Sequence, residues 1–179
     1  MSNILRTKCV VIGDSAVGKT ALVQVFLHDR TYFPKNYSMT TGVSLSVGKV
    51  NIPETKDTVE IYLHDCSGKD IYQDFTQELW SDSPLAVIVF DTCSSSSLNS
   101  MLSVHVLFHA VVCLITGILV GTKADLKERR SVSLKGAQEM AKRIGFQYFE
   151  CSSKEAEGVQ EPFFYLASQW HKLVEKDVA

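Results

Sequence analysis

The stretch from Gly13 to Thr20, GDSAVGKT, constrains the fold of this chain more than any other feature. It satisfies the pattern G-x-x-x-x-G-K-[ST], in which a glycine-rich loop closes backbone N–H groups around phosphate oxygens at the start of a helix. An apolar run precedes it and a segment with helical spacing follows it, so strand, loop and helix occur in the required order. We therefore expect a nucleoside triphosphate as ligand, with Lys19 on its terminal phosphates and the Thr20 hydroxyl on Mg²⁺.

Further apolar runs indicate the rest of a sheet. Four of them end in polar turns, as strands covered on both faces do: residues 8–14, 85–91, 117–125 and 146–153. Two others alternate apolar and polar residues across PETKD and predict an antiparallel hairpin at one edge: residues 42–52 and 58–65. Helical spacing follows in three segments: residues 18–29, 133–145 and 161–176. The pattern predicts an α/β domain with helices on both faces of a mostly parallel sheet.

The last predicted helix carries apolar residues on one face. These are Phe163, Leu166, Ala167, Trp170, Leu173 and Val174, and we expect them to pack on the sheet. Phe163, Phe164 and Trp170 are also candidates for a contact with another protein, although core packing accounts for most of this face.

Length and charge set the limits of this interpretation. A chain of 179 residues, 45% hydrophobic, fits a single domain over residues 1–179. Its net charge of -2 provides no broad field for nucleic acid or an acidic membrane. The five cysteines form no C-x-x-C pair, and this indicates a reducing, cytoplasmic setting. The beginning MSN and the end KDVA lack the glycine and cysteine that lipid attachment needs, so we expect no lipid anchor.

Three more stretches at predicted strand ends select the type of nucleotide. Asp65 to Gly68 ends a hairpin strand, where the acid can hold Mg²⁺ through water and the glycine amide can meet the γ-phosphate. TKAD ends another strand, and the Asp125 carboxylate can accept both N–H groups on the Watson–Crick edge of guanine, which adenine does not offer. CSSK, residues 151–154, closes the last strand. A nucleotide kinase would share the phosphate loop but would not explain TKAD.

In this order and at these spacings, the motifs resemble the Ras superfamily of small GTPases over nearly the whole chain. The resemblance implies a six-stranded, mostly parallel sheet, GTP or GDP with Mg²⁺ as cofactors, and GTP hydrolysis. It implies the following nucleotide contacts: Gly13, Ser15, Ala16, Val17, Gly18, Lys19, Thr20, Ala21, Phe33, Thr40, Asp65, Gly68, Thr122, Lys123, Asp125, Ser152, Ser153 and Lys154. Thr20, Thr40 and Asp65 are the implied metal ligands, and Gly68 and Lys69 occupy the catalytic turn.

Within the superfamily, YSMTTGVSL and VEIYLHDCSGKD look Rab-like. Together with QELWSDSP and the last helix, they are similar to the Rab-like GTPases of the intraflagellar transport B complex. That similarity implies a small β-sandwich subunit and other subunits of the complex as partners, and the cytoplasm, the cilium and the ciliary base as locations. A Rab-like role in general vesicle trafficking is the alternative.

Lys69 departs from the family, which usually has a glutamine that orients the attacking water. A lysine has no carbonyl to accept a proton from that water, so we expect slow hydrolysis with retained GTP binding. Two functions are consistent with this expectation: a switch that hydrolyses GTP slowly, and a scaffold that stays bound to GTP. Thr122 replaces the usual asparagine before Lys123, and Ser67 replaces alanine.

The stretch from Thr92 to Thr122 contains no Asp, Glu, Lys or Arg. Residues 101–120 have the length of a membrane span, but their last part is needed for the sheet, so we expect no transmembrane segment. His105 and His109 have helical metal-ligand spacing without a third ligand nearby. We expect residues 100–116 to expose an apolar surface, because they offer few polar side chains to water. A partner-binding surface and an altered reading through a splice junction are the two interpretations.

Overall fold

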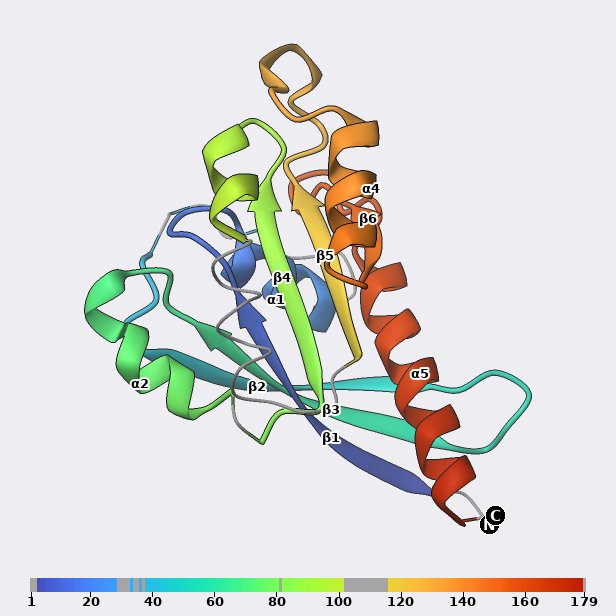
Figure 1. The fold of residues 1–179 in the computed structure, drawn as a ribbon. Coiled ribbons are helices and arrows are strands. Elements are labelled where there is room, and N and C mark those ends of the chain that lie inside the picture. Colours follow the sequence, from blue (N-terminus) through green and yellow to red (C-terminus); the bar gives the residue numbers. More distant parts are fainter. Residues whose placement is uncertain are drawn as a thin grey trace.

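A six-stranded sheet runs through the centre of the protein, in the order β2-β3-β1-β4-β5-β6 (Figure 1). The structure is a computed structural model that describes residues 3–28, 33, 36, 38–80, 82–101 and 116–178. The strands are β1 (Ile4–Ile12), β2 (Val43–Asn51), β3 (Thr58–Cys66), β4 (Leu85–Asp91), β5 (Thr116–Thr122) and β6 (Gln147–Glu150). Every neighbouring pair is parallel except β2 and β3. The prediction of a mostly parallel sheet is thus confirmed.

The predicted edge hairpin is also confirmed. β2 and β3 pair antiparallel from Val43 opposite Cys66 to Asn51 opposite Thr58. β6 is shorter than the predicted run and ends at Glu150, because the following residues turn back to form an isolated bridge between Ser152 and Glu157. β1 begins earlier than predicted, since it continues its pairing with β3 back to Ile4.

One face of the sheet is covered by α1 (Lys19–Leu27) and α5 (Gln160–Val178). The rings of Phe26 and Phe163 stack between these helices with their centroids 3.9 Å apart. Leu166 and Ala167 are fully buried in the same core cluster. This packing holds α1 against α5, and α1 follows directly on the glycine-rich loop.

The other face is covered by a helical segment at residues 95–101 and by α4 (Leu134–Arg143), together with Trp80, which follows α2 (Gln73–Glu78). The 3₁₀ turns η1 (Asp70–Tyr72) and η2 (Lys127–Arg129) contribute no buried residues. Ser133 caps α4 by accepting a hydrogen bond from the Gly136 N–H. The second core cluster includes Met101 and Ala137, which are fully buried. Helices therefore lie on both faces, as predicted.

The burial of α5 differs from the prediction near its end. Leu173 is 44% exposed, and His171 is buried instead, with 4% of its surface accessible. Nε2 of His171 lies 3.0 Å from Oδ2 of Asp57, which precedes β3. This polar contact replaces apolar packing where α5 meets the end of the β2–β3 hairpin.

The predictions for residues 102–115, including His105, His109 and the exposed apolar surface, lie outside the described residues. The assignment of residues 117–122 to a strand is confirmed, because β5 pairs with β4 from Thr116 onward. Among the described residues, no helix is long and apolar enough to cross a membrane.

Candidate functional site

A cavity of about 650 Å³ lies beside the loops that follow β1, β3, β5 and β6. Ligands bind at this edge in open α/β sheets, because the loops after parallel strands meet there. The predicted contact residues that line the cavity are Ser15, Ala16, Gly18, Lys19, Thr20, Ala21, Phe33, Thr40, Gly68, Thr122, Lys123, Asp125, Ser153 and Lys154. The structure thus brings together side chains from residue 15 to residue 154.

Four other predicted residues do not line the cavity but support its walls. The Gly13 carbonyl accepts a hydrogen bond from Lys19, and the Val17 carbonyl accepts one from Thr122. Asp65 accepts a hydrogen bond from Thr20, and Ser152 donates one to Asp125. Each of them therefore contacts a residue that lines the cavity.

The glycine-rich loop packs tightly on the sheet. Gly13 has a φ of 149°, and a Cβ there would lie 2.1 Å from the Val89 carbonyl oxygen, so only glycine fits. Lys19 is buried, and its Nζ donates hydrogen bonds to the carbonyls of Gly13 (2.9 Å) and Asp14 (2.7 Å). Burial lowers the pKa of Lys19, against the opposing effect of Asp65. The loop therefore holds a buried ammonium group beside the cavity.

Three side chains with oxygen atoms that could ligate a metal, Thr20, Thr40 and Asp65, converge beside Lys19. The Thr20 hydroxyl donates to Oδ2 of Asp65 at 2.6 Å and lies 2.8 Å from the Thr40 hydroxyl. Oδ1 of Asp65 is buried and has no hydrogen-bond partner in the part of the chain that the structure describes. Burial raises the pKa of Asp65, against the opposing effects of the Thr20 hydrogen bond and the Lys19 charge. Two hydroxyls and one carboxylate suit a hard cation such as Mg²⁺.

The turn after β3 touches the phosphate loop directly. A Cβ at Gly68 would lie 2.4 Å from both the Asp14 carbonyl carbon and the Ser15 nitrogen. Lys69, the next residue, is exposed and is not among the residues that line the cavity. The close approach depends on glycine, whereas the Lys69 side chain is free of close packing.

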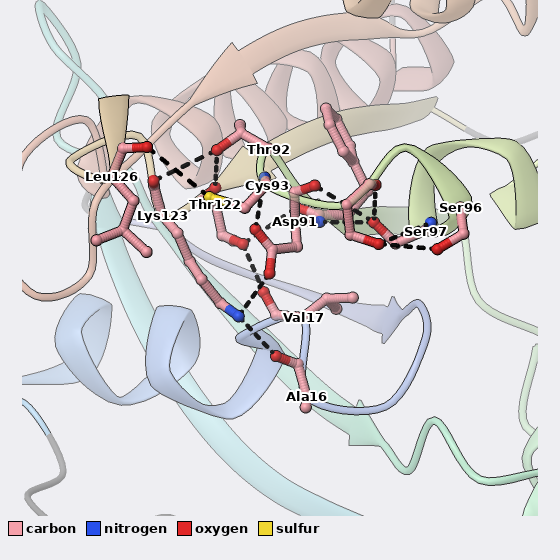
Figure 2. A network of polar contacts seen from close by, with 12 residues as sticks. Ala16, Val17, Asp91, Thr92, Cys93, Ser96, Ser97, Thr122, Lys123 and Leu126 are labelled. Carbon is pink, nitrogen blue, oxygen red and sulfur yellow. Dashed lines mark hydrogen bonds and ion pairs between the residues drawn. The ribbon is translucent and has the colours of Figure 1, made fainter. Parts of the chain in front are cut away.

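The turn after β5 is held by a lysine that reaches the phosphate loop. Nζ of Lys123 donates to the Ala16 carbonyl at 3.1 Å and lies 2.6 Å from Oδ2 of Asp91 (Figure 2). Lys123 has a φ of 59°, in the left-handed region. Two residues on, Oδ1 of Asp125 accepts a 2.7 Å hydrogen bond from the Ser152 hydroxyl. The loops after β5 and β6 therefore present Asp125 together.

Thr122 performs a specific task at this position. Its hydroxyl lies within hydrogen-bond distance of the Val17 carbonyl and 3.1 Å from the Phe90 carbonyl, and the residue is 2% exposed. The threonine thus ties the turn after β5 to the phosphate loop.

Sequence reasoning missed several residues that support the site. Asp91 ends β4 and Thr92 follows it, and both contact the turn after β5 (Figure 2). The position of Asp91 at the end of a buried strand was the signal that could have found it. Ser100 donates to Oδ2 of Asp14 at 2.7 Å, a contact across 86 positions that no local pattern predicts.

A half-buried ion pair joins the loop after β5 to the end of β6. Arg130 forms two hydrogen bonds with Glu150, one of 3.0 Å from Nη1 to Oε2, and the Tyr148 hydroxyl donates to Oε1 of Glu150 at 2.5 Å. Burial alone would raise the pKa of Glu150, but these hydrogen bonds outweigh it and lower the pKa.

The whole-chain comparison assigns the family. The model of the Ras family matches residues 8–172, so the chain belongs to the Ras family of small GTPases. Guanine-nucleotide binding is the property that this family membership implies.

The individual relatives narrow the assignment further. Intraflagellar transport protein 27 homolog from Bos taurus is 39% identical over 171 residues, which cover 94% of this chain and 92% of that protein. Intraflagellar transport protein 27 from Chlamydomonas reinhardtii is 32% identical over 181 residues, with coverages of 98% and 89%. Ras-related protein Rab-2B from Dictyostelium discoideum is 34% identical over 173 residues, with coverages of 95% and 83%. The chain is therefore related to the intraflagellar transport protein 27 group and also resembles Rab proteins.

Proposed function

We propose that the cavity binds GTP and GDP, with the base read by Asp125. One observation carries this proposal: the Asp125 carboxylate is fixed by Ser152 and lines the same cavity as the glycine-rich loop. Its remaining lone pairs are available to the two N–H groups on the edge of guanine. Phe33 and Lys123 line the same cavity and supply flat or aliphatic surface for the base.

Mg²⁺ belongs to the same proposal. Thr20, Thr40 and Asp65 would hold it, because their oxygens already converge and Asp65 retains a buried oxygen that has no hydrogen-bond partner among the described residues. When bound, the ion neutralises phosphate charge. Lys19 contributes a second positive charge from the loop itself, and Gly68 allows the turn after β3 to approach the phosphate loop.

Denaturing the purified protein and identifying the released nucleotide tests the binding directly. We expect GDP or GTP. In a second arm, Asp125→Asn should shift the preference from guanine toward xanthine nucleotides, because an amide can donate to the carbonyl that xanthine carries in place of the guanine amino group. Glu139→Gln, on the exposed surface of α4, is the matched control and should leave the preference unchanged. Equal affinity of the unmodified protein for ATP and GTP would refute the proposal.

We further propose that the protein hydrolyses GTP slowly. Lys69 supports this proposal, because its side chain has no acceptor for a proton of water and is exposed beside the turn. The rate of GTP hydrolysis distinguishes two forms of this proposal. In one the protein is a slow switch whose GTP form recruits effectors, and in the other it is a scaffold that stays bound to GTP. Single-turnover hydrolysis measured beside a glutamine-containing Rab protein separates them.

The cellular role that we propose is in intraflagellar transport, in the cytoplasm, the cilium and the ciliary base. The similarity to intraflagellar transport protein 27 over 94% of the chain supports it. The partners would be a small β-sandwich subunit and other subunits of the intraflagellar transport B complex. General vesicle trafficking remains the second candidate, because Rab-2B is 34% identical over 173 residues.

The outer surface of α5 supports a protein partner. Phe164 and Leu173 are 41% and 44% exposed, whereas Phe163 is fully buried and belongs to the core. Phe164 also lines a groove with Phe149 and Tyr165. Phe164→Glu should reduce co-purification of transport subunits from ciliated cells, and Leu134→Glu, at a similarly exposed site on α4, should not. Loss of the complex in both variants, or in neither, would contradict a role of α5.

A further inference from the structure

We propose that Thr92 is a positioning residue for base recognition: its buried hydroxyl holds the turn after β5 in the conformation that presents Asp125 to the base. The inference rests on the proposed guanine-nucleotide binding and adds a residue and a task that no motif of the sequence indicates. Thr92 lies directly after β4 and does not line the cavity, so it acts through the residues that do.

Thr92 joins three parts of the chain at one point. Its hydroxyl donates to the Thr122 carbonyl at 2.8 Å and lies 3.3 Å from the Lys123 carbonyl (Figure 2). Its backbone N–H donates to the same Thr122 carbonyl at 3.1 Å. Its own carbonyl accepts hydrogen bonds from the N–H groups of Ser131 and Val132, just before α4. The residue is 1% exposed, so none of these bonds competes with bulk water.

The Thr92 hydroxyl contacts the backbone on both sides of the strained residue of this turn, Lys123. Lys123 has a φ of 59°, a left-handed conformation that costs a non-glycine residue free energy and persists only where its surroundings hold it. On one side of this residue, the Thr122 carbonyl is fixed by Thr92. On the other, the Lys123 carbonyl accepts from the Leu126 N–H at 3.0 Å. Asp125 lies between these two anchors, so its direction depends on both.

Thr122 cannot hold the turn in this way with its own side chain. A hydroxyl has one proton, and the Thr122 hydroxyl already faces the Val17 and Phe90 carbonyls. The Thr92 hydroxyl therefore supplies a separate bond. The two threonine hydroxyls have different roles. Thr122 binds the turn to the phosphate loop, and Thr92 orients the backbone that leads to Asp125.

Thr92→Val and Thr92→Ser test the inference in the full-length protein. Valine keeps the volume and removes the hydroxyl, while serine keeps the hydroxyl. The readout is the ratio of the affinities for GDP and IDP, because IDP lacks the amino group that Asp125 would accept. We expect the unmodified protein to favour GDP by roughly 10-fold or more, as a hydrogen bond to a charged group implies. We expect the Thr92→Val variant to lose most of this preference and the Thr92→Ser variant to keep it.

The two nucleotides separate positioning from stability. A purely structural role would weaken GDP and IDP equally and leave the ratio unchanged in the folded Thr92→Val variant, which would overturn the inference. Thermal melts establish that each variant is folded, and if the valine variant does not fold, Thr92→Ala, which also lacks the hydroxyl, replaces it in the comparison with Thr92→Ser. Asp125→Ala tests the proposed function separately. If the unmodified protein does not prefer GDP over IDP, or if the Asp125→Ala variant keeps this preference, recognition of the base by Asp125 is refuted.

Discussion

The Thr20 hydroxyl donates a 2.6 Å hydrogen bond to Oδ2 of Asp65, across 45 positions of the chain. Thr20 is the second residue of α1 and Asp65 is the next-to-last residue of β3, so the contact joins the end of the phosphate loop to the strand that precedes Gly68. Oδ1 of Asp65 has no hydrogen-bond partner among the described residues. The pair thus leaves a buried carboxylate oxygen that a cation could accept as a ligand.

Thr20→Val is expected to weaken Mg²⁺-dependent binding of GTP. The change removes the hydroxyl that would ligate the ion and leaves the Asp65 carboxylate with the longer hydrogen bond from Thr40 alone among the described residues, at a cost of about 1–3 kcal/mol. Thr20→Ser, which keeps the hydroxyl, should bind normally. Titration of GTP with and without a chelator measures the effect. An affinity that is the same in both variants, or insensitive to the chelator, is incompatible with the proposed metal site.

Gly68→Ala is expected to separate the turn after β3 from the phosphate loop. The added Cβ would lie 2.4 Å from backbone atoms of Asp14 and Ser15, and backbone cannot rotate away as a flexible side chain can. We expect a reduced distinction between GTP and GDP, with the fold retained. Hydrogen exchange of residues 65–72 in the two nucleotide states provides the measurement. Gly136→Ala, which would meet only the Ser133 hydroxyl at 3.1 Å, is the control. Identical protection patterns in the Gly68→Ala variant and the unmodified protein would argue against this role.

The sequence predicted which candidate residues meet at one edge of the sheet where one short segment supplies both the residue and the strand end before it. Lys19, Asp65 and Asp125 are such cases, because parallel strands bring their carboxyl ends to one edge. It did not predict Thr92 or His171. Their contacts join residues 30 or more positions apart, and they depend on strand order and helix packing that no local period encodes.

Lys69→Gln is expected to raise single-turnover GTP hydrolysis. Glutamine offers a carbonyl that can accept a proton of the attacking water, and this is what the exposed lysine lacks. Lys69→Met, which has neither charge nor carbonyl, distinguishes the two effects: it should remain slow if orientation of water is missing. An increase in both variants would mean that the positive charge, and not the missing carbonyl, restrains hydrolysis.

The contact between His171 and Asp57 predicts a pH dependence of stability. The hydrogen bond from His171, followed by that from the Asn3 N–H, lowers the pKa of Asp57. A depressed carboxyl pKa contributes stability above the pKa of the unfolded chain, near 3.9 for aspartate, and loses it as the pH falls through the folded value. As the pH falls below about 5, the free energy of unfolding of the unmodified protein should therefore decrease more than that of the Asp57→Asn variant. Urea unfolding of both proteins at several pH values measures this difference. A constant difference between the two proteins across this window would contradict the assignment.

Ala16→Gly is expected to stabilise the folded protein slightly. Ala16 lies in the phosphate loop with a φ of 62°, a left-handed conformation that costs an alanine about 1–2 kcal/mol. Glycine removes this cost but gains about 0.4–1 kcal/mol of conformational freedom in the unfolded chain, so the net effect should lie between zero and about 1.6 kcal/mol in favour of the fold. Ala21→Gly, inside α1, provides the opposite case and should destabilise by about 1 kcal/mol. Ala156→Gly, at a φ of 54°, should behave like Ala16→Gly. Urea unfolding of the three variants without nucleotide compares them. If Ala16→Gly destabilises the protein as much as Ala21→Gly does, the left-handed conformation carries no strain and the prediction is wrong.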